Sequence, residues 1–168
     1  MAAPLIQIRA AAHADLPGIL SIYNREVLVS TATYDTVPRT EAAHRTWFSV
    51  HGPDYPVFVA DLDGAVIGWA SLSPWSDRAA YARSAEVSEY VDEEHRRMGA
   101  GRRLLQELID AGRAHGYHAL LARISADNEA SVRLHAQLGF SVAGTLREVG
   151  EKFGRTLDVC IMELIIPS

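Results

Sequence analysis

Apolar and polar residues recur with two periods along the chain, and together these periods predict a mixed α/β fold. A first strand is expected over Leu5–Ala11, where the two kinds of residue alternate. Asp15 then stands at the position of a helix cap, and Pro17 suits the first helical turn. The apolar face of this helix carries Leu16, Ile19, Tyr23 and Val27.

A polar loop, a second helix and a hairpin are expected next. The loop covers Ser30–Thr40, and its last residue can cap a helix that buries Trp47 and Val50. Two apolar-rich runs then meet at Asp63-Gly64, a dipeptide that favours the tight turn of a β-hairpin. We therefore expect two antiparallel strands in this part of the chain.

Two more helices and four more strands complete the prediction. The longer helix follows a basic glycine turn and has one apolar stripe, made of Leu104, Leu105, Leu108 and Ile109. The shorter helix is capped by Asp127 or Asn128 and ends at Gly139. The strands are expected over Ser84–Asp92, Tyr117–Ser125, Phe140–Gly150 and Leu157–Ile166. The resulting order, β α α β β β α β α β β, has no repeat and no linker, so residues 1–168 are expected to form one α/β domain.

Composition restricts the classes of protein to consider. Apolar residues make up 48% of the 168 residues and charged residues 22%, which is typical of a globular domain. The net charge of −5 argues against a general nucleic-acid binder. Cys160 is the single cysteine, expected to be buried in a strand, and fits a reducing compartment. No leader-like pattern opens the chain and no run reaches about 18 apolar residues, so we expect a cytoplasmic protein without a membrane partner.

The basic glycine turn is the feature with clearest chemistry. It reads Arg96-x-x-Gly99-x-Gly101-Arg102, between a predicted strand and a predicted helix. It lacks the third glycine of a dinucleotide fingerprint and the Lys-Ser/Thr of a nucleotide-binding loop. Arginines at a helix start oppose the helix dipole unless an anion is present. Because glycines allow close approach and first-turn N–H groups are unpaired, we expect a diphosphate here, as an alternative to a merely solvated basic turn.

The turn also resembles the coenzyme A site of the GNAT superfamily of N-acetyltransferases. The resemblance rests on Arg96-x-x-Gly99-x-Gly101 followed by "NEASVRLHAQLGF", and it covers nearly the whole chain. The fragments "SPWSDRAAY", "AEVSEYVDEEHR" and "GTLREVGEKFGRTLDV" are similar to phosphinothricin and methionine sulfone or sulfoximine acetyltransferases. The resemblance implies a GNAT fold with a central, mostly antiparallel mixed sheet, acetyl-CoA as cosubstrate, and a homodimer.

The resemblance also assigns residues to the coenzyme. The turn's amides would bind the diphosphate, the preceding strand would pair with the pantetheine arm, and the later asparagine and helix would flank the thioester. The implied cofactor-binding residues are Val87, Ser88, Tyr90, Val91, Arg96, Arg97, Met98, Gly99, Ala100, Gly101, Arg102, Asn128 and Ser131.

Acetylation of an amine requires a neutral nucleophile, so a base is needed. An alkylammonium group must lose a proton at a cost of about 1.4 to 4 kcal/mol at pH 7. Glu86 is the candidate, because "AE" at this point resembles the subfamily's proposed catalytic glutamate, and a solvent-facing glutamate is the alternative. Glu89 is the rival carboxylate. Glu86 and Glu89 are three residues apart on one strand, so their side chains point to opposite faces of the sheet, and we expect only one of them to face the cleft. The resemblance implies that His135 protonates or stabilises the departing thiolate.

A phosphinothricin-like or methionine-sulfoximine-like substrate carries a carboxylate and a polar tetrahedral end, which cations and hydroxyls would bind. The candidate substrate-binding residues, each with a plain surface role as the alternative, are Tyr34, Arg78, Arg83, Lys152 and Arg155. Ala82 and Thr156 depart from residues that related sequences often carry there, which leaves the exact amino acid open.

No metal is expected. His44, His51, His115 and His118 do not form a convincing set of ligands, since zinc requires three or four converging groups.

The expected activity is acetyl-CoA-dependent acetylation of the α-amino group of a small amino-acid-like compound, by direct attack of the amine on the thioester in a ternary complex. Two alternatives remain open. One is an acetyltransferase for a protein N-terminus, a peptide or another amine. The other is a noncatalytic acyl-CoA sensor, against which Glu86 and His135 argue.

Overall fold

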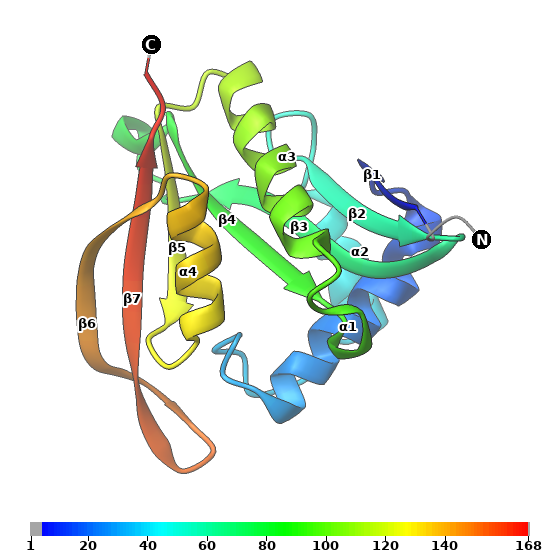
Figure 1. The fold of residues 1–168 in the computed structure, drawn as a ribbon, viewed down its shortest axis with the longest axis horizontal. Coiled ribbons are helices and arrows are strands. Elements are labelled where there is room, and N and C mark those ends of the chain that lie inside the picture. The colour runs from blue at the N-terminus through cyan, green and yellow to red at the C-terminus, as the bar shows by residue number, and fades with distance from the viewer. Residues whose placement is uncertain (1–4, 168) are drawn as a thin grey trace.

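The computed structural model describes residues 5–167. The expectation about the N-terminus includes residues 1–4, which lie outside this range. The described part contains one seven-stranded sheet and four α-helices (Figure 1). The strands are β1 (Ile6–Ala10), β2 (Val57–Leu62), β3 (Ala65–Pro74), β4 (Ser84–Val91), β5 (Ala119–Ser125), β6 (Ser141–Lys152) and β7 (Arg155–Ile165). The helices are α1 (Leu16–Val29), α2 (Glu41–Ser49), α3 (Ala100–Ala114) and α4 (Glu129–Gln137). The predicted fold class and element order are confirmed.

The sheet has the strand order β1-β2-β3-β4-β5-β7-β6. Every neighbouring pair is antiparallel except β4 and β5. This parallel pair is short: Ser84–Glu86 lies against Ala119–Leu121, and the two strands then diverge (Figure 1). Within residues 5–167, no strand pairs with that edge of β4 beyond Glu86. The divergence opens the sheet and places free backbone groups along the opening.

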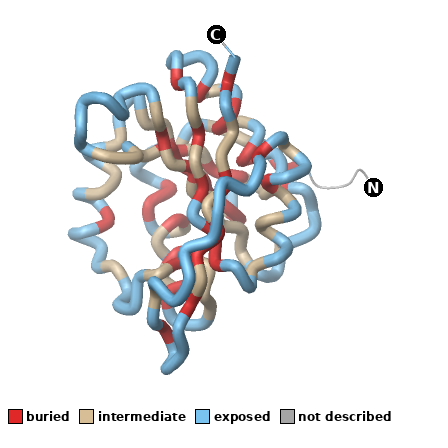
Figure 2. Tube along the Cα trace, turned by 90° about the vertical axis from the view of Figure 1, so that its left-hand side faces the viewer, coloured by how far each residue is buried: buried red, intermediate tan, exposed pale blue. Residues whose placement is uncertain are grey.

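Two apolar cores hold the sheet, one on each face. The predicted stripe of α3 packs on one face, and Leu104, Leu105 and Leu108 have no exposed surface. On the other face, α1 packs Ile19 and Val27 against the central strands. Figure 2 shows that the buried residues gather in the interior of the molecule, with exposed segments around them. Burying each such side chain contributes about 1.5–3 kcal/mol. The two cores fix α1 and α3 on opposite sides of β4.

Two details of the predicted helices are wrong. Val50 is 70% exposed because α2 ends one residue earlier, and the buried residue of α2 is His44, stacked on the ring of Trp47. Asp15 precedes α1 but makes no side-chain cap to it. Its carboxylate instead accepts hydrogen bonds from Arg9 at 2.8 Å and from the Ala12 N–H at 2.7 Å.

Other turn and cap predictions are confirmed. Thr40 Oγ1 accepts a hydrogen bond from the Ala43 N–H at 3.1 Å. Asp63 and Gly64 both have positive φ, as the tight hairpin turn between β2 and β3 requires. Asp127 and Asn128 were the two candidates for the N-cap of α4. Asn128 is the N-cap residue, because its side chain accepts a hydrogen bond from the Ser131 N–H.

Candidate active site

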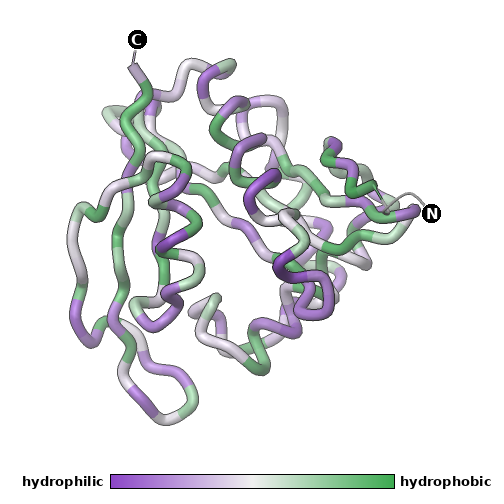
Figure 3. The backbone as a smooth tube through the Cα atoms, viewed as in Figure 1, coloured by the Kyte–Doolittle hydropathy of each residue, from purple (hydrophilic) through white to green (hydrophobic). Residues whose placement is uncertain are grey.

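A cavity of about 650 Å³ lies between the free edge of β4 and the N-termini of α3 and α4. The basic turn forms one wall, and the hydrophilic stretch between β4 and α3 is evident in Figure 3. Ten of the predicted cofactor residues line it: Tyr90, Val91, Arg96, Arg97, Gly99, Ala100, Gly101, Arg102, Asn128 and Ser131. The pattern in the sequence therefore does correspond to one concave surface.

The start of α3 is built to receive an anion. Gly99 is the N-cap residue, with φ of +86°, a conformation that costs glycine little, and the described structure gives it no side-chain cap. The first backbone bond of the helix runs from the Arg103 N–H to the Gly99 carbonyl, at 3.1 Å. The three preceding N–H groups, which include that of Gly101, therefore have no intrahelical acceptor. They provide the donors that a diphosphate requires.

The free edge of β4 is the second element that suits coenzyme A. Backbone N–H and C=O groups between Val87 and Val91 have no strand partner on the β5 side in the described chain. An extended amide-bearing arm could pair with them as an added strand would. The residues present thus fit the cosubstrate at both its diphosphate and its pantetheine arm.

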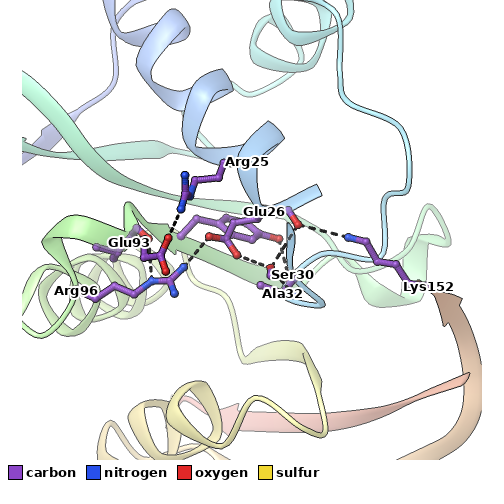
Figure 4. A network of polar contacts seen from close by, with 9 residues as sticks. Arg25, Glu26, Ser30, Ala32, Glu93, Arg96 and Lys152 are labelled. Atoms are coloured by element: carbon purple, nitrogen blue, oxygen red, sulfur yellow. Dashed lines mark hydrogen bonds and ion pairs between the residues drawn. The ribbon is translucent and has the colours of Figure 1, made fainter. Parts of the chain in front are cut away.

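The arginines of the turn are not equally available to a phosphate. Arg96 Nη2 donates to the buried carboxylate of Glu26 at 2.6 Å (Figure 4). The Nε of Arg96 donates to the Val91 carbonyl. Arg103 donates to the Ile6 carbonyl. Arg97 and Arg102 line the cavity, whereas Met98 is exposed and lies outside its described lining.

A second cavity of about 330 Å³ lies deeper in the opening between β4 and β5. It shares Ala32, Glu89, Tyr90, Asn128 and Ser131 with the first cavity, so the two are adjoining. The other residues that line it include five that were predicted to belong to the site: Glu86, Val87, Ser88, His135 and Tyr34. Molecules bound in the two cavities would therefore lie next to each other.

Glu86 projects from β4 into this second cavity. Its Oε2 lies 3.5 Å from Nη1 of Arg123, and its side chain is largely covered. Burial raises the pKa of Glu86, and the positive charge of Arg123 opposes that rise. A carboxylate with a raised pKa is a better match for the proton of an amine.

Glu89 lines both cavities. It lies on the α3 face of β4, where its Oε2 would be 3.4 Å from a Cβ added to Gly101. Desolvation raises the pKa of Glu89 to about 7, opposed by Arg96. The expectation that only one of the two glutamates faces the cleft is wrong. The opening between β4 and β5 connects the two faces of the sheet, so side chains from both faces reach it.

His135, on α4, is buried, and its imidazole packs edge-on against Phe140. Its Nδ1 lies 2.8 Å from the Ser131 carbonyl, which can only accept, so Nδ1 carries a proton. Burial lowers the pKa of His135, and the neutral ring is therefore favoured. In that form Nε2 has a lone pair and no proton. The ring can give a proton from Nε2 only after receiving one there.

Of the residues predicted to bind the substrate, Tyr34 lines the second cavity, whereas Lys152 is buried outside its described lining. The hydroxyl of Tyr34 is bonded to the Asp158 carbonyl at 3.1 Å. Lys152 is only 3% exposed, and its Nζ donates to the Thr33 carbonyl at 2.8 Å. The same Nζ lies 3.5 Å from the Glu26 carbonyl (Figure 4). Its ammonium is thus occupied in tying β6 to the loop after α1. This burial lowers the pKa of Lys152.

The three predicted arginines have other surroundings. Arg83 Nε donates to the Gly116 carbonyl at 3.2 Å. Arg155 pairs with Asp127 at 2.9 Å, beside an open hollow along β6 and β7. Arg78 is exposed at the turn before β4. The structure does not bring these three together with Glu86.

Sequence reasoning missed the cation that does lie in the second cavity, Arg123 of β5. Its guanidinium stacks over the ring of Trp75, with Cζ 4.5 Å from the ring centroid. A signal was present in the sequence, because Arg123 is the one charged residue in the apolar run Ala119–Ser125. Its proximity to Glu86 depends on strand pairing between segments far apart in the chain.

Two adjoining cavities, one with free helix N–H donors and the other with two glutamates and a histidine, suit the transfer of a group between two bound molecules. The chain belongs to the acetyltransferase (GNAT) family, whose model matches residues 18–140. Enzymes of this family use acetyl-CoA.

Three similar proteins represent the neighbours of the chain. It is 43% identical to an L-methionine sulfoximine/L-methionine sulfone acetyltransferase of Pseudomonas aeruginosa, over 94% of this chain and 92% of that protein. A phosphinothricin acetyltransferase of Sinorhizobium meliloti in complex with acetyl-CoA is 39% identical, with a TM-score of 0.93 over 96% of this chain and 88% of that one. A structure described as a ribosomal-protein-alanine N-acetyltransferase of Brucella melitensis is 40% identical, with a TM-score of 0.93 over 95% and 99%.

No helix within residues 5–167 is both long and apolar enough to span a membrane. The same residues include no cluster of three or more His, Cys, Asp or Glu side chains suited to a metal ion.

Proposed function

We propose that this protein transfers the acetyl group of acetyl-CoA to the α-amino group of a small amino acid, of the methionine sulfone, methionine sulfoximine or phosphinothricin type. The observation that carries the proposal is the pair of adjoining cavities. One has the donors that suit a coenzyme, and the other holds Glu86 next to a cation. Because the cavities share a wall, both substrates can be bound together and the amine can attack the thioester directly.

In this proposal the coenzyme occupies the larger cavity. Its diphosphate accepts hydrogen bonds from the first turn of α3, with Arg97 and Arg102 supplying charge. The pantetheine arm pairs with the free edge of β4 near Tyr90. Asn128 caps α4 through its oxygen, which leaves its NH₂ free to donate to an amide of the arm.

Glu86 acts as the general base, directly or through one water. Removing the ammonium proton costs about 1.4 to 4 kcal/mol at pH 7, which a positioned carboxylate can offset. After the amine has attacked, its nitrogen still carries a proton that must be lost. Nε2 of His135 accepts this proton and passes it to the departing thiolate, since Nδ1 keeps its own proton in the bond to the Ser131 carbonyl. Glu89 is the alternative base, because its raised pKa is also closer to that of an amine.

Acetylation of a protein N-terminus is the second candidate, because a 40% identical structure is described as a ribosomal-protein-alanine N-acetyltransferase. Against it stands the size of the acceptor cavity, about 330 Å³, which is at the lower end of the range for small-molecule sites. A peptide substrate would require a groove that continues past the reacting amine. A sensor without turnover is opposed by the presence of Glu86 and His135 in one cavity.

We also propose a homodimer of a single-domain cytoplasmic chain. β6 is an edge strand, and Val142, Leu146 and Val149 on it are each more than half exposed. Phe153, at the turn that follows, is also exposed. An apolar edge strand favours pairing with a second chain. Light scattering after gel filtration tests this: Leu146→Glu should give a monomer if β6 forms the interface.

The test of the activity is release of coenzyme A from acetyl-CoA in the presence of candidate amines. The panel contains L-methionine sulfone, L-methionine sulfoximine, phosphinothricin, the common amino acids and short peptides with N-terminal alanine. Turnover of free amino acids and not of peptides is expected. Tight acetyl-CoA binding without turnover of any amine would overturn the enzyme proposal, and preferential turnover of peptides would replace it with the second candidate.

A further inference from the structure

Arg123 lies beside Glu86 because of the short parallel pairing of β4 and β5. Glu86 is paired with Leu121, and Arg123 is two residues further along β5, on the same face. The cavity between the diverging strands is lined by both charged side chains. Arg123 is therefore held where an acceptor amine must approach its base.

The guanidinium of Arg123 is oriented by contacts that leave its N–H groups available. Its flat face stacks on Trp75 at 4.5 Å, which restricts the side chain without using a donor. At 3.5 Å, its approach to Glu86 is an ion pair without hydrogen-bond geometry. Within residues 5–167, the guanidinium of Arg123 donates no hydrogen bond, whereas those of Arg9 and Arg96 donate to carboxylates in the same structure. Its side chain is 48% exposed.

We propose that Arg123 binds the α-carboxylate of the acceptor amino acid and thereby selects amino acids over simple amines. The proposal rests on the function proposed above, with Glu86 as the group that receives the amine's proton. A guanidinium binds a carboxylate through two parallel N–H donors, and the donors of Arg123 are free for this. None of the residues expected from the sequence to bind the substrate supplies such a cation to this cavity.

The covalent geometry of an amino acid indicates which anionic group of the substrate Arg123 would bind. In an α-amino acid, a carboxylate oxygen lies about 3 Å from the amino nitrogen, because only the α-carbon and the carboxyl carbon separate them. Glu86 and Arg123 are 3.5 Å apart, so one acceptor can place its amine on the first and its carboxylate on the second. A phosphinate or sulfone at the end of the side chain is several bonds further away. That end must therefore occupy another part of the cavity.

The experiment compares an amino acid with its decarboxylated amine. L-Methionine sulfone and 3-(methylsulfonyl)propan-1-amine share the polar end and the amine and differ in the carboxylate. Arg123→Met keeps most of the bulk that packs on Trp75 and removes the charge. It should lower kcat/KM for L-methionine sulfone about 100-fold, as expected for lost hydrogen bonds to a charged group, and change kcat/KM for the amine less than about 3-fold.

Two further variants complete the design. Arg123→Lys keeps the charge without the paired donors and should give an intermediate loss. Arg113→Met, an exposed arginine on α3 paired with Asp110, is the matched control and should leave both substrates unchanged. Circular dichroism and acetyl-CoA affinity should be the same in all variants. If Arg123→Met does not fold, Arg123→Lys with the same two substrates decides the question.

Each outcome has a definite meaning. Equal losses for the amino acid and the amine in Arg123→Met, or no loss for either, would overturn the proposal while leaving the acetyltransferase activity established. A loss for phosphinothricin alone would show that Arg123 binds the anionic tail, which also overturns it. Wild-type protein that turns over no amino acid, yet binds acetyl-CoA, would overturn the proposed function itself, and this inference with it.

Discussion

Glu26 of α1 and Arg96 of the turn before α3 form an ion pair, with Oε1 and Nη2 separated by 2.6 Å. Glu26 is buried, and its other carboxylate oxygen accepts a hydrogen bond from Ser30 (Figure 4). The carboxylate therefore joins the coenzyme turn to the end of α1, which leads into the loop lining the acceptor cavity. Removing one partner of a buried, hydrogen-bonded charge is costly because the other partners lose their bonds.

We expect Glu26→Ala to lower the free energy of unfolding by about 1–3 kcal/mol and to weaken acetyl-CoA binding, since the turn loses its anchor. Urea unfolding and calorimetric titration measure the two effects. Arg25→Gln is the matched control, because the neighbouring pair of Arg25 and Glu93 is exposed on both sides and should matter by less than about 1 kcal/mol. Similar losses in both variants would contradict a special role for Glu26.

Gly101→Ala separates helix stability from coenzyme binding. A Cβ at this position in α3 meets only ordinary contacts, 3.4 Å or more from Glu89 and Leu134, and alanine favours a helix by about 1 kcal/mol over glycine. The variant should therefore be as stable as the wild type or more so. Because Gly101 lines the coenzyme cavity, the affinity for acetyl-CoA should nevertheless fall.

Gly99→Ala is the comparison for this prediction. Its φ of +86° is unfavourable for alanine, so both stability and acetyl-CoA affinity should decrease. Thermal unfolding and calorimetric titration of the two variants give the answer. Unchanged affinity in Gly101→Ala would mean that the first turn of α3 does not approach the coenzyme.

The choice of base is tested by Glu86→Gln and Glu89→Gln. Burial raises the pKa of Glu86, and a base acts in its ionised form, so activity should increase with pH through that pKa. Glu86→Gln should lower kcat about 100-fold or more and remove this limb of the pH profile of kcat/KM. If the limb instead lies near pH 7 and disappears in Glu89→Gln, Glu89 is the base.

Glu89 also predicts a dependence of stability on pH. Burial raises its pKa to about 7 in the folded protein, from an ordinary value of 4.5, so the folded state binds the proton more tightly. The corresponding stability is present below about pH 4.5 and is lost as the pH rises to about 7. Glu89→Gln should therefore gain stability over the wild type at pH 8 and not at pH 4. Equal differences in melting temperature at the two pH values would contradict the raised pKa.

The sequence by itself determined the local structure of this protein. The 3.6-residue stripe of Leu104 and Leu108, the tight turn at Asp63-Gly64 and the cap at Thr40 depend on neighbours within a few residues, and each was found as predicted. The glycine pattern before α3 likewise carries its geometry in its own backbone. Val50 was misplaced because periodicity does not say where a helix ends.

Only the tertiary structure decided which side chains meet. Arg96 is engaged by Glu26, 70 residues away, and Lys152 by the Thr33 carbonyl, 119 residues away. Both glutamates reach one opening because β4 and β5 diverge after Glu86, and the same divergence places Arg123 in the acceptor cavity. Strand order and the point where two strands separate are set by packing on both faces of the whole sheet, and no local period in the sequence records them.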